Sequence, residues 1–342
     1  MHRALPRRTA DGTEVTRSTP GGGLYGRSLR KQGRGADRNR PTGVRVGTTM
    51  TTINDAGVLR YTAFSASPDG GNPAGVVLDA AALSAAEMLA IAAEVGYSET
   101  AFLFPARAGT DTRAGGRTYG VRYFSPLAEV PFCGHATVAA AVALAEVHGP
   151  GELLLSAPVG TIPVTVTEAD GRLQATLTSV EPHNRPVAAP DLAEALAALG
   201  WAGSELDPRI PPRIAFAGAH HLVLGAATRR RLADLAYDFD RLQALMLRLD
   251  LTTLQLVWRD PSDDRVFHVR NPFPVGGVVE DPATGAAAAA FGGFARELGL
   301  VPASSTLTLH QGEDMGRPGV LTVGLRTGDP RVHVTGAAAP LG

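Results

Sequence analysis

Two alanine-rich stretches decide the fold: CGHATVAAA at residues 133–141 and DPATGAAAA at residues 281–289. They begin 148 residues apart and predict two helices, one over residues 133–149 and one over residues 281–298. Each stretch opens with a group that can carry a proton and continues with small residues, which let a ligand approach the backbone. The first N–H groups of a helix lack partners within it and lie at its positive end. Each helix start is therefore a candidate carboxylate site.

The order of elements around these helices repeats. Strands are expected at residues 59–65, 76–78, 98–104 and 121–124, then a helix at 227–249 and strands at 252–258 and 265–269. A further helix is expected to begin at Ser84, with Glu87 completing a capping box. The motifs YFSP at 123–126 and VRNP at 269–272 lie 146 residues apart, close to the helix spacing. The sequence therefore predicts a duplicated fold.

Small side chains continue along both expected helices. This pattern is typical of a helix enclosed by a strongly curved sheet, where bulky side chains would not fit; a general richness in alanine is the alternative. We predict an α+β fold with two pseudo-symmetric domains, each a rolled, mostly antiparallel sheet around a central helix. The N-terminal domain is expected at residues 58–175, completed by a C-terminal strand at 330–340, and the C-terminal domain at 176–325.

The composition is that of an ordinary folded protein. Of the 342 residues, 44% are hydrophobic and 19% are charged. No apolar run approaches the roughly 20 residues that cross a bilayer, so we expect no membrane partner. The single cysteine excludes an internal disulfide and fits a cytoplasmic location.

Residues 1–49 differ from the rest of the chain. They carry 11 Lys or Arg against 3 Asp or Glu, a net charge of +8, whereas the remaining residues carry −9. Glycine, arginine, threonine and proline predominate here, so we predict a disordered basic tail. Met50 begins the first segment expected to fold. We favour a misread upstream start codon over a nucleic-acid-binding arm, and expect no nucleic-acid partner.

Three residues are candidates for acid/base chemistry. Glu99 lies where an apolar strand begins, a position that partly desolvates a carboxylate and raises its pKa. His135 falls in the first turn of the first expected helix, where the positive helix end favours the neutral ring. Asp281 opens the second. Structural roles stay open for all three: a rim carboxylate, a hydrogen-bonded core histidine and a helix N-cap.

Cys133 opens the first expected helix, so we expect the helix terminus to lower the pKa of its thiol. Because no second cysteine exists, a mechanism with two thiols is excluded. We expect no metal site: the chain has no H-E-x-x-H motif, and His220 and His221 fall in a strand, where neighbouring side chains point to opposite faces. P-loop and G-x-S-x-G motifs are also missing. Proton transfer without a cofactor is the chemistry that remains.

Six motifs, taken in order, resemble the PhzF family of phenazine-biosynthesis isomerase-like proteins. They are GNPAGVV at 71–77, SETAF at 98–102, FSP at 124–126 with Glu129, CGHAT at 133–137, EDPATG at 280–285 and QGEDMGRP at 311–318. The family shares its fold with diaminopimelate epimerase and proline racemase, and its enzymes use no cofactor. The phenazine enzyme isomerises dihydro-3-hydroxyanthranilate by shifting a proton. The resemblance implies two pseudo-symmetric domains with the site at their interface.

The same resemblance implies roles for individual residues. Glu99 falls on the catalytic acid/base, and His135 and Asp281 fall on further catalytic residues. The residues expected to bind substrate are Asn72, Gly134, Thr284, Gly285 and Ala286. Ala286 stands where the phenazine enzyme has a serine, and Asp281 and Pro282 occupy the region where proline racemases place a second cysteine. The resemblance therefore favours an isomerase over a racemase.

The sequence thus predicts a cofactor-independent isomerase that shifts a proton on a small carboxylate or amino-acid-like substrate bound between the two domains. Alternatives are a one-thiol amino-acid racemase or epimerase that uses Cys133, and a non-catalytic protein that binds a small ligand. A homodimer is possible by resemblance. For the motif at 311–318 we expect a turn and no chemical role.

Overall fold

The computed structural model describes residues 57–105 and 117–342. The basic tail predicted at residues 1–49 lies outside them. All described residues belong to one compact unit, so the boundary predicted between two domains stays a prediction. We call strands β1 to β8 with their helices the first half, and the elements from β9 onward the second half.

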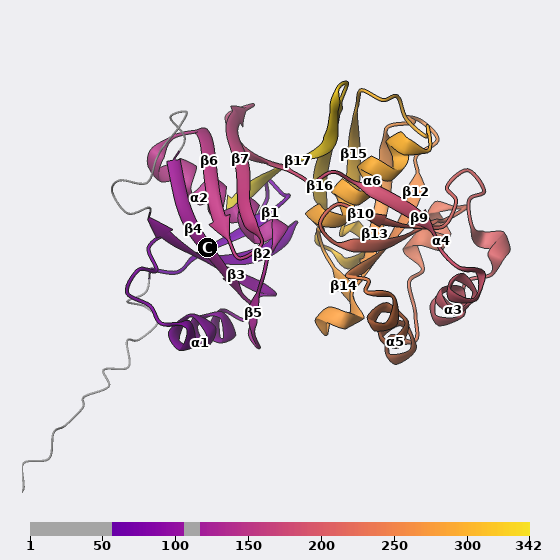
Figure 1. The fold of residues 1–342 in the computed structure, drawn as a ribbon, viewed down its shortest axis with the longest axis horizontal. Coiled ribbons are helices and arrows are strands. Elements are labelled where there is room, and N and C mark those ends of the chain that lie inside the picture. The colour runs from indigo at the N-terminus through magenta and orange to yellow at the C-terminus, as the bar shows by residue number, and fades with distance from the viewer. Residues whose placement is uncertain (1–56, 106–116) are drawn as a thin grey trace, which may run out of the picture. The chain divides into compact units, whose positions relative to one another are not determined.

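In the first half, strands close into a ring around helix α2 (Gly134–His148). The strands are β1 (Leu59–Ala63), β2 (Asn72–Val77), β3 (Glu99–Pro105), β4 (Arg117–Phe124), β6 (Gly151–Ala157), β7 (Gly160–Ala169), β8 (Arg172–Thr178) and β17 (Asp329–Pro340). Each pairs with the next in this order, and β17 pairs back onto β1. Helix α2 packs against strands on several sides of this ring (Figure 1). Residues 135–145 are all buried, which explains why this helix is built of small residues.

The second half repeats the arrangement around helix α6 (Gly285–Glu297). Its strands pair in the order β9 (His183–Pro186), β10 (Arg213–Phe216), β11 (His220–Gly225), β12 (Thr253–Arg259), β13 (Val266–Pro272), β15 (Ser305–Gln311), β16 (Gly319–Arg326) and β17. Parallel pairs occur at matching places, β2–β3 with β11–β12 and β4–β6 with β13–β15. The short strands β5 (Glu129–Val130) and β14 (Glu280–Asp281) also match. The order and direction of strand pairing therefore correspond in the two halves, as the predicted duplication requires.

Strand β17 belongs to both halves. Its first part pairs with β16, for example Val334 with Val323. Its last residues pair with β1, where Pro340 lies opposite Tyr61. The chain therefore crosses between the halves twice. It first crosses after β8, where it enters the second half at β9, which pairs with β10, and it returns along β17. The end of the chain therefore completes the ring in which β2 and β3 carry site residues.

The remaining helices lie outside the rings. They are α1 (Ala85–Val95), α3 (Ala189–Leu199), α4 (Arg229–Ala233) and α5 (Phe239–Leu249). The capping box of Ser84 and Glu87 is present at the start of α1, as predicted. The single helix expected at 227–249 is wrong, because the helical pattern holds two separate helices. Helix α4 begins after its N-cap Thr228 and ends at Ala233, and Asp238 then caps the start of α5. The periodicity of apolar residues did not reveal the break.

The fold class, a mixed α+β fold rich in strands, is as predicted. Short 3-10 turns, η2 (Gly203–Glu205), η3 (Pro274–Gly276) and η4 (Glu313–Met315), complete the chain. Among the helices of the described residues, none is long and apolar enough to cross a membrane.

Candidate active site

The starts of helices α2 and α6 lie against each other. A Cβ atom added at Gly134 would lie 3.9 Å from Cα of Gly285, and one added at Gly285 would lie 3.2 Å from the ring of Phe64. The first distance is an ordinary van der Waals contact, whereas the second is tight, so a side chain at Gly285 would require the ring of Phe64 to shift. The second helix begins later than predicted. Thr284 is the N-cap and Asp281 lies in β14, so the expectation that Asp281 opens or caps this helix is wrong.

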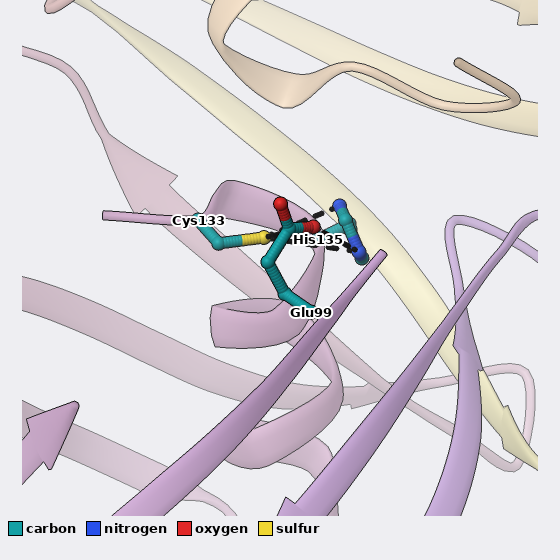
Figure 2. Close-up of side chains that lie close together, drawn as sticks. All are labelled: Glu99, Cys133 and His135. Carbon is teal, nitrogen blue, oxygen red and sulfur yellow. Dashed lines mark hydrogen bonds and ion pairs between the residues drawn. The ribbon is translucent and has the colours of Figure 1, made fainter. Parts of the chain in front are cut away.

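Three side chains of the first half converge beside the start of α2 (Figure 2). The thiol of Cys133 donates to Oε2 of Glu99 at 3.4 Å. Nε2 of His135 lies 3.4 Å from the same Oε2, and Sγ of Cys133 lies 3.3 Å from Nδ1 of His135. Strand β3 supplies Glu99 as its first residue, Cys133 is the N-cap of α2, and His135 lies in the first turn of that helix. The acid, the thiol and the imidazole therefore form one cluster.

Asn72 joins this cluster to Asp281 of the second half. Its Nδ2 donates to Oδ1 of Asp281 at 2.7 Å and lies 3.1 Å from Nδ1 of His135. The hydroxyl of Thr284 donates to the other oxygen of Asp281 at 2.5 Å. Both carboxylate oxygens of Asp281 are thus held by neutral donors, and its side chain is fixed relative to His135.

Burial controls the protonation of the site. It raises the pKa of Glu99 above its usual value, against the hydrogen bonds from Ser98 and Cys133. It raises the pKa of Asp281 to about 6, although His135, Thr284 and Asn72 oppose the rise. Burial also lowers the pKa of His135, so the neutral ring is favoured. The direction expected for His135 is right, but its largest cause is burial. A carboxyl group whose pKa is raised by burial is a candidate to give or take a proton, and this holds for both Glu99 and Asp281.

The expectation for Cys133 is wrong in direction. Its thiol pKa lies well above the usual value, because the sulfur is buried and Glu99 and Asp281 are anionic neighbours. A backbone hydrogen bond from Ala136 opposes the rise and is outweighed. Cys133 is therefore a thiol in the free protein, since desolvation and nearby negative charge exceed the effect of the helix start.

A cleft of about 800 Å³ opens onto these groups. Residues 96–99 and 125–127 line it on one side, and segments within residues 273–282 line it on the other. Asn72, Glu99 and Asp281 contribute to its wall. His135, with 6% of its surface exposed, and Cys133 lie behind them. Glu99 is thus the member of the cluster that a bound molecule meets.

The charged side chains among the described residues that line this cleft are all acidic: Glu99, Glu280 and Asp281. Glu280 is paired with Arg270 through two hydrogen bonds of 2.9 and 2.5 Å. Tyr97, Phe273 and exposed Leu127 and Val278 make much of the remaining wall apolar. Such a wall favours an uncharged ring or chain beside a small polar group.

Comparison with known proteins identifies relatives of this chain. Residues 61–342 match the family model of the phenazine biosynthesis-like proteins, PhzC-PhzF. The chain belongs to the phenazine biosynthesis-like family. It is 28% identical over 293 residues to the uncharacterized isomerase YfhB of Bacillus subtilis, covering 84% of this chain and 97% of that protein. It is 30% identical over 261 residues to the trans-2,3-dihydro-3-hydroxyanthranilate isomerase of Pseudomonas aeruginosa, covering 75% and 85%.

Solved structures show the same fold. The PhzF-family phenazine biosynthesis protein of Bacillus anthracis matches with a TM-score of 0.73 at 24% identity, over 83% of this chain and 96% of that one. A hydroxyproline epimerase of Agrobacterium vitis matches with a TM-score of 0.57 at 14% identity, over 83% and 90%. Both likenesses concern the fold alone.

The late motif at 311–318 supports the site, a role that the sequence analysis missed. Gln311 is buried; its Nε2 donates to the backbone carbonyl of Asp281 at 2.8 Å and to Oγ1 of Thr284 at 3.0 Å. Its Oε1 accepts from the backbone N–H of Thr284 at 3.1 Å. Arg317 donates to the carbonyls of Gly70 and Gly71, just before Asn72, at 2.6 and 2.8 Å. The expected turn is present as η4, but the residues on either side of it fix both halves of this family member's site.

The residues predicted to bind substrate lie around the same junction. Gly134 and Gly285 are the first residues of their helices, and Thr284 caps α6. Ala286 is partly exposed in the first turn of α6. Of the predicted substrate-binding residues, Asn72 lines the cleft. That the others bind substrate stays a prediction.

Proposed function

We propose that this member of the phenazine biosynthesis-like family is a cofactor-independent isomerase that shifts a proton on a small amino-acid-like carboxylate. The observation that carries the proposal is the Glu99 carboxyl, which lines the cleft and has a raised pKa. It also lies within 3.4 Å of both a thiol and an imidazole. Relatives that align with most of the chain are named isomerases, which supports the reaction class.

In the proposed mechanism, ionised Glu99 removes a proton from an activated C–H bond of the substrate and becomes a carboxylic acid. The electron pair moves along the conjugated system, and Glu99 then gives the proton to another carbon on the same face. At the end of the reaction Glu99 is ionised again, and the substrate has lost one C–H bond and gained another. Burial suits this role, because it brings the pKa of the acid closer to neutral pH.

Asp281 acts on the substrate without taking its proton, and His135, which lies behind the wall, acts through Glu99, 3.4 Å away. Asp281 faces the cleft, and Asn72 and Thr284 hold its two oxygens. Neutral His135 can donate or accept a hydrogen bond as charge develops. A positioned acid/base contributes about 10²–10⁴-fold, so oriented hydrogen bonds and the two helix starts must supply further stabilisation of the transition state.

The lining of the cleft favours an amino-acid-like substrate. Its acidic residues suit an ammonium group. A carboxylate would be held by the N–H groups at the starts of α2 and α6, which lie behind the residues that line the cleft. A ring would fit against the apolar wall. The relative from Pseudomonas aeruginosa is named for trans-2,3-dihydro-3-hydroxyanthranilate, a compound that contains these three features.

A one-thiol racemase or epimerase is the second candidate, because Sγ of Cys133 lies 3.4 Å from Glu99. The raised thiol pKa and the position of Cys133 behind the wall argue against it. Cys133→Ala separates the two: it abolishes turnover by a one-thiol racemase, whereas an isomerase that depends on Glu99 retains most of its turnover.

The proposal is tested by incubating the protein with a panel of small cyclic and acyclic amino acids in deuterated water. NMR spectra should show deuterium entering one carbon, together with a shift of a double bond in the product. A compound that raises the melting temperature but gains no deuterium and no new product would instead favour the third candidate, a protein that only binds the ligand.

A further inference from the structure

The three clustered side chains of the first half have the spacing of metal ligands. Sγ of Cys133 lies 3.7 Å from Nε2 of His135 and 3.4 Å from Oε2 of Glu99, and Nε2 lies 3.4 Å from Oε2. Tetrahedral Zn²⁺, with bonds of about 2.3 Å to sulfur and about 2.0–2.2 Å to nitrogen and oxygen, would separate its ligand atoms by about 3.3–3.6 Å. The observed triangle therefore needs little adjustment to hold such an ion.

The chemistry of the donors agrees with the spacing. A thiolate, an imidazole and a carboxylate are the ligand types that Zn²⁺ prefers. Among the described residues, Glu99, Cys133 and His135 are the group of three potential metal ligands whose ligand atoms all lie within 4.8 Å of one another. Glu99 forms part of the cleft wall, so a fourth coordination position would be open to water or to a bound molecule. Three protein ligands with one open position form an accessible site, unlike a closed structural one.

The surroundings favour a cation. Asp281 is also close enough to act electrostatically on Cys133, and it faces the cluster from the second half. These carboxylates and the thiolate repel one another when they are ionised. A divalent cation relieves that repulsion, and Asn72, 3.1 Å from the second ring nitrogen of His135, would orient the imidazole.

We propose that Glu99, Cys133 and His135 form a binding site for a thiophilic divalent cation, with Zn²⁺ the best fit, and that the bound cation switches off the acid/base group. Binding replaces the thiol proton by a metal–sulfur bond and releases that proton to solvent, with no change of oxidation state. The first part of this inference, that the cation binds (the binding half), does not depend on the proposed function. The inhibition half rests on the proposed function, since it requires Glu99 to be the acid/base.

Titration with CoCl₂ tests the binding half without any substrate. Because the chain has one cysteine, a thiolate-to-cobalt charge-transfer band can come only from Cys133. We expect such a band to saturate at one Co²⁺ per chain, to strengthen as pH rises, and to disappear when ZnCl₂ is added. Cys133→Ser should abolish the band. Glu99→Gln and His135→Asn should each weaken Co²⁺ binding by at least tenfold, with circular dichroism confirming that the variants are folded.

His268→Gln is the matched control. His268 lies 2.6 Å from Glu313 in another histidine–carboxylate pair, outside the cleft, and its loss should leave Co²⁺ binding as in the wild type. Absence of the band in the wild-type protein would overturn the proposal. So would wild-type affinity in both Glu99→Gln and His135→Asn.

The inhibition half is tested with the compound that exchanges deuterium. ZnCl₂ at one equivalent should reduce the exchange rate at least tenfold, and a chelator should restore it. Unchanged or faster exchange with Zn²⁺ bound would overturn this half. If no compound exchanges deuterium, the proposed function fails, and calorimetric and spectroscopic titrations still decide whether the cation binds.

Discussion

Nδ2 of Asn72 donates a hydrogen bond of 2.7 Å to Oδ1 of Asp281, which lies 209 residues further along the chain. Asn72 is the first residue of β2, and Asp281 ends β14. The same amide lies 3.1 Å from the ring of His135. One neutral side chain thus sets the distance between Asp281 and His135, the two groups that are proposed to assist Glu99.

Asn72→Ala should damage both stability and turnover. It leaves Oδ1 of Asp281 without this donor inside a buried site, and an unsatisfied buried polar group costs about 1–3 kcal/mol. Urea unfolding should show a loss of this size, and turnover should fall at least tenfold. Asn184→Ala, which removes an amide bonded to Glu297 and Arg213 outside the site, is the control and should cost less than about 1 kcal/mol. Equal losses in the two variants would contradict the role given to Asn72.

The titration of Asp281 predicts how stability depends on pH. Burial raises its pKa from 3.8 in the unfolded chain to about 6 in the folded protein. The folded state thus holds this proton more tightly than the unfolded chain does. The stabilisation that the protonated Asp281 carboxyl contributes is therefore complete below the unfolded pKa of 3.8, and it is lost as the pH rises through about 6. The shift corresponds to about 3 kcal/mol.

Asp281→Asn removes this titration, so the variant is the reference with which the wild type is compared. Urea unfolding from about pH 3.5 to 7.5 should show the wild type losing about 3 kcal/mol relative to the variant, with most of the change between pH 4 and 6. A difference that stays constant over this range would show that the carboxyl pKa is not raised.

Gln311→Leu tests the support given by the late motif. A leucine of similar size cannot bond to the backbone of Asp281 and Thr284, so their polar groups lose buried partners. We expect a loss of about 1–3 kcal/mol in urea unfolding, together with a lower kcat, because Asp281 is no longer fixed. Gln174→Leu, at a partly exposed position on β8, should change neither kcat nor KM. If Gln311→Leu keeps the wild-type kcat, the late motif serves folding alone.

Much of the fold followed from local pattern. Alanine-rich stretches predicted the two central helices, and the nearly constant offset predicted the duplication, because enclosed helices and repeated units leave strong sequence signals. The split between α4 and α5 was missed, since two N-caps lie within one continuous helical pattern. The start of α6 was placed too early because Asp281 has N-cap chemistry but lies in a short strand.

The site was harder to predict where it depends on distant contacts. Glu99 and His135 stood out by their positions at the starts of a strand and a helix. The roles of Gln311 and Arg317 depend on bonds to residues 27 and 246 positions away, which no local pattern encodes. The direction of the Cys133 pKa was wrong because burial and the charge of Glu99 outweigh the helix start.

Solvent deuterium exchange by Glu99→Gln is the most direct test of the proposed proton shuttle. The substitution keeps the shape of the side chain and removes its ability to take a proton. With a substrate that the wild type converts in deuterated water, the exchange rate should fall by about 10²–10⁴-fold. Glu152→Gln, which alters an exposed carboxylate on β6, should exchange at the wild-type rate. Exchange by Glu99→Gln within about twofold of the wild type would contradict the central role of Glu99.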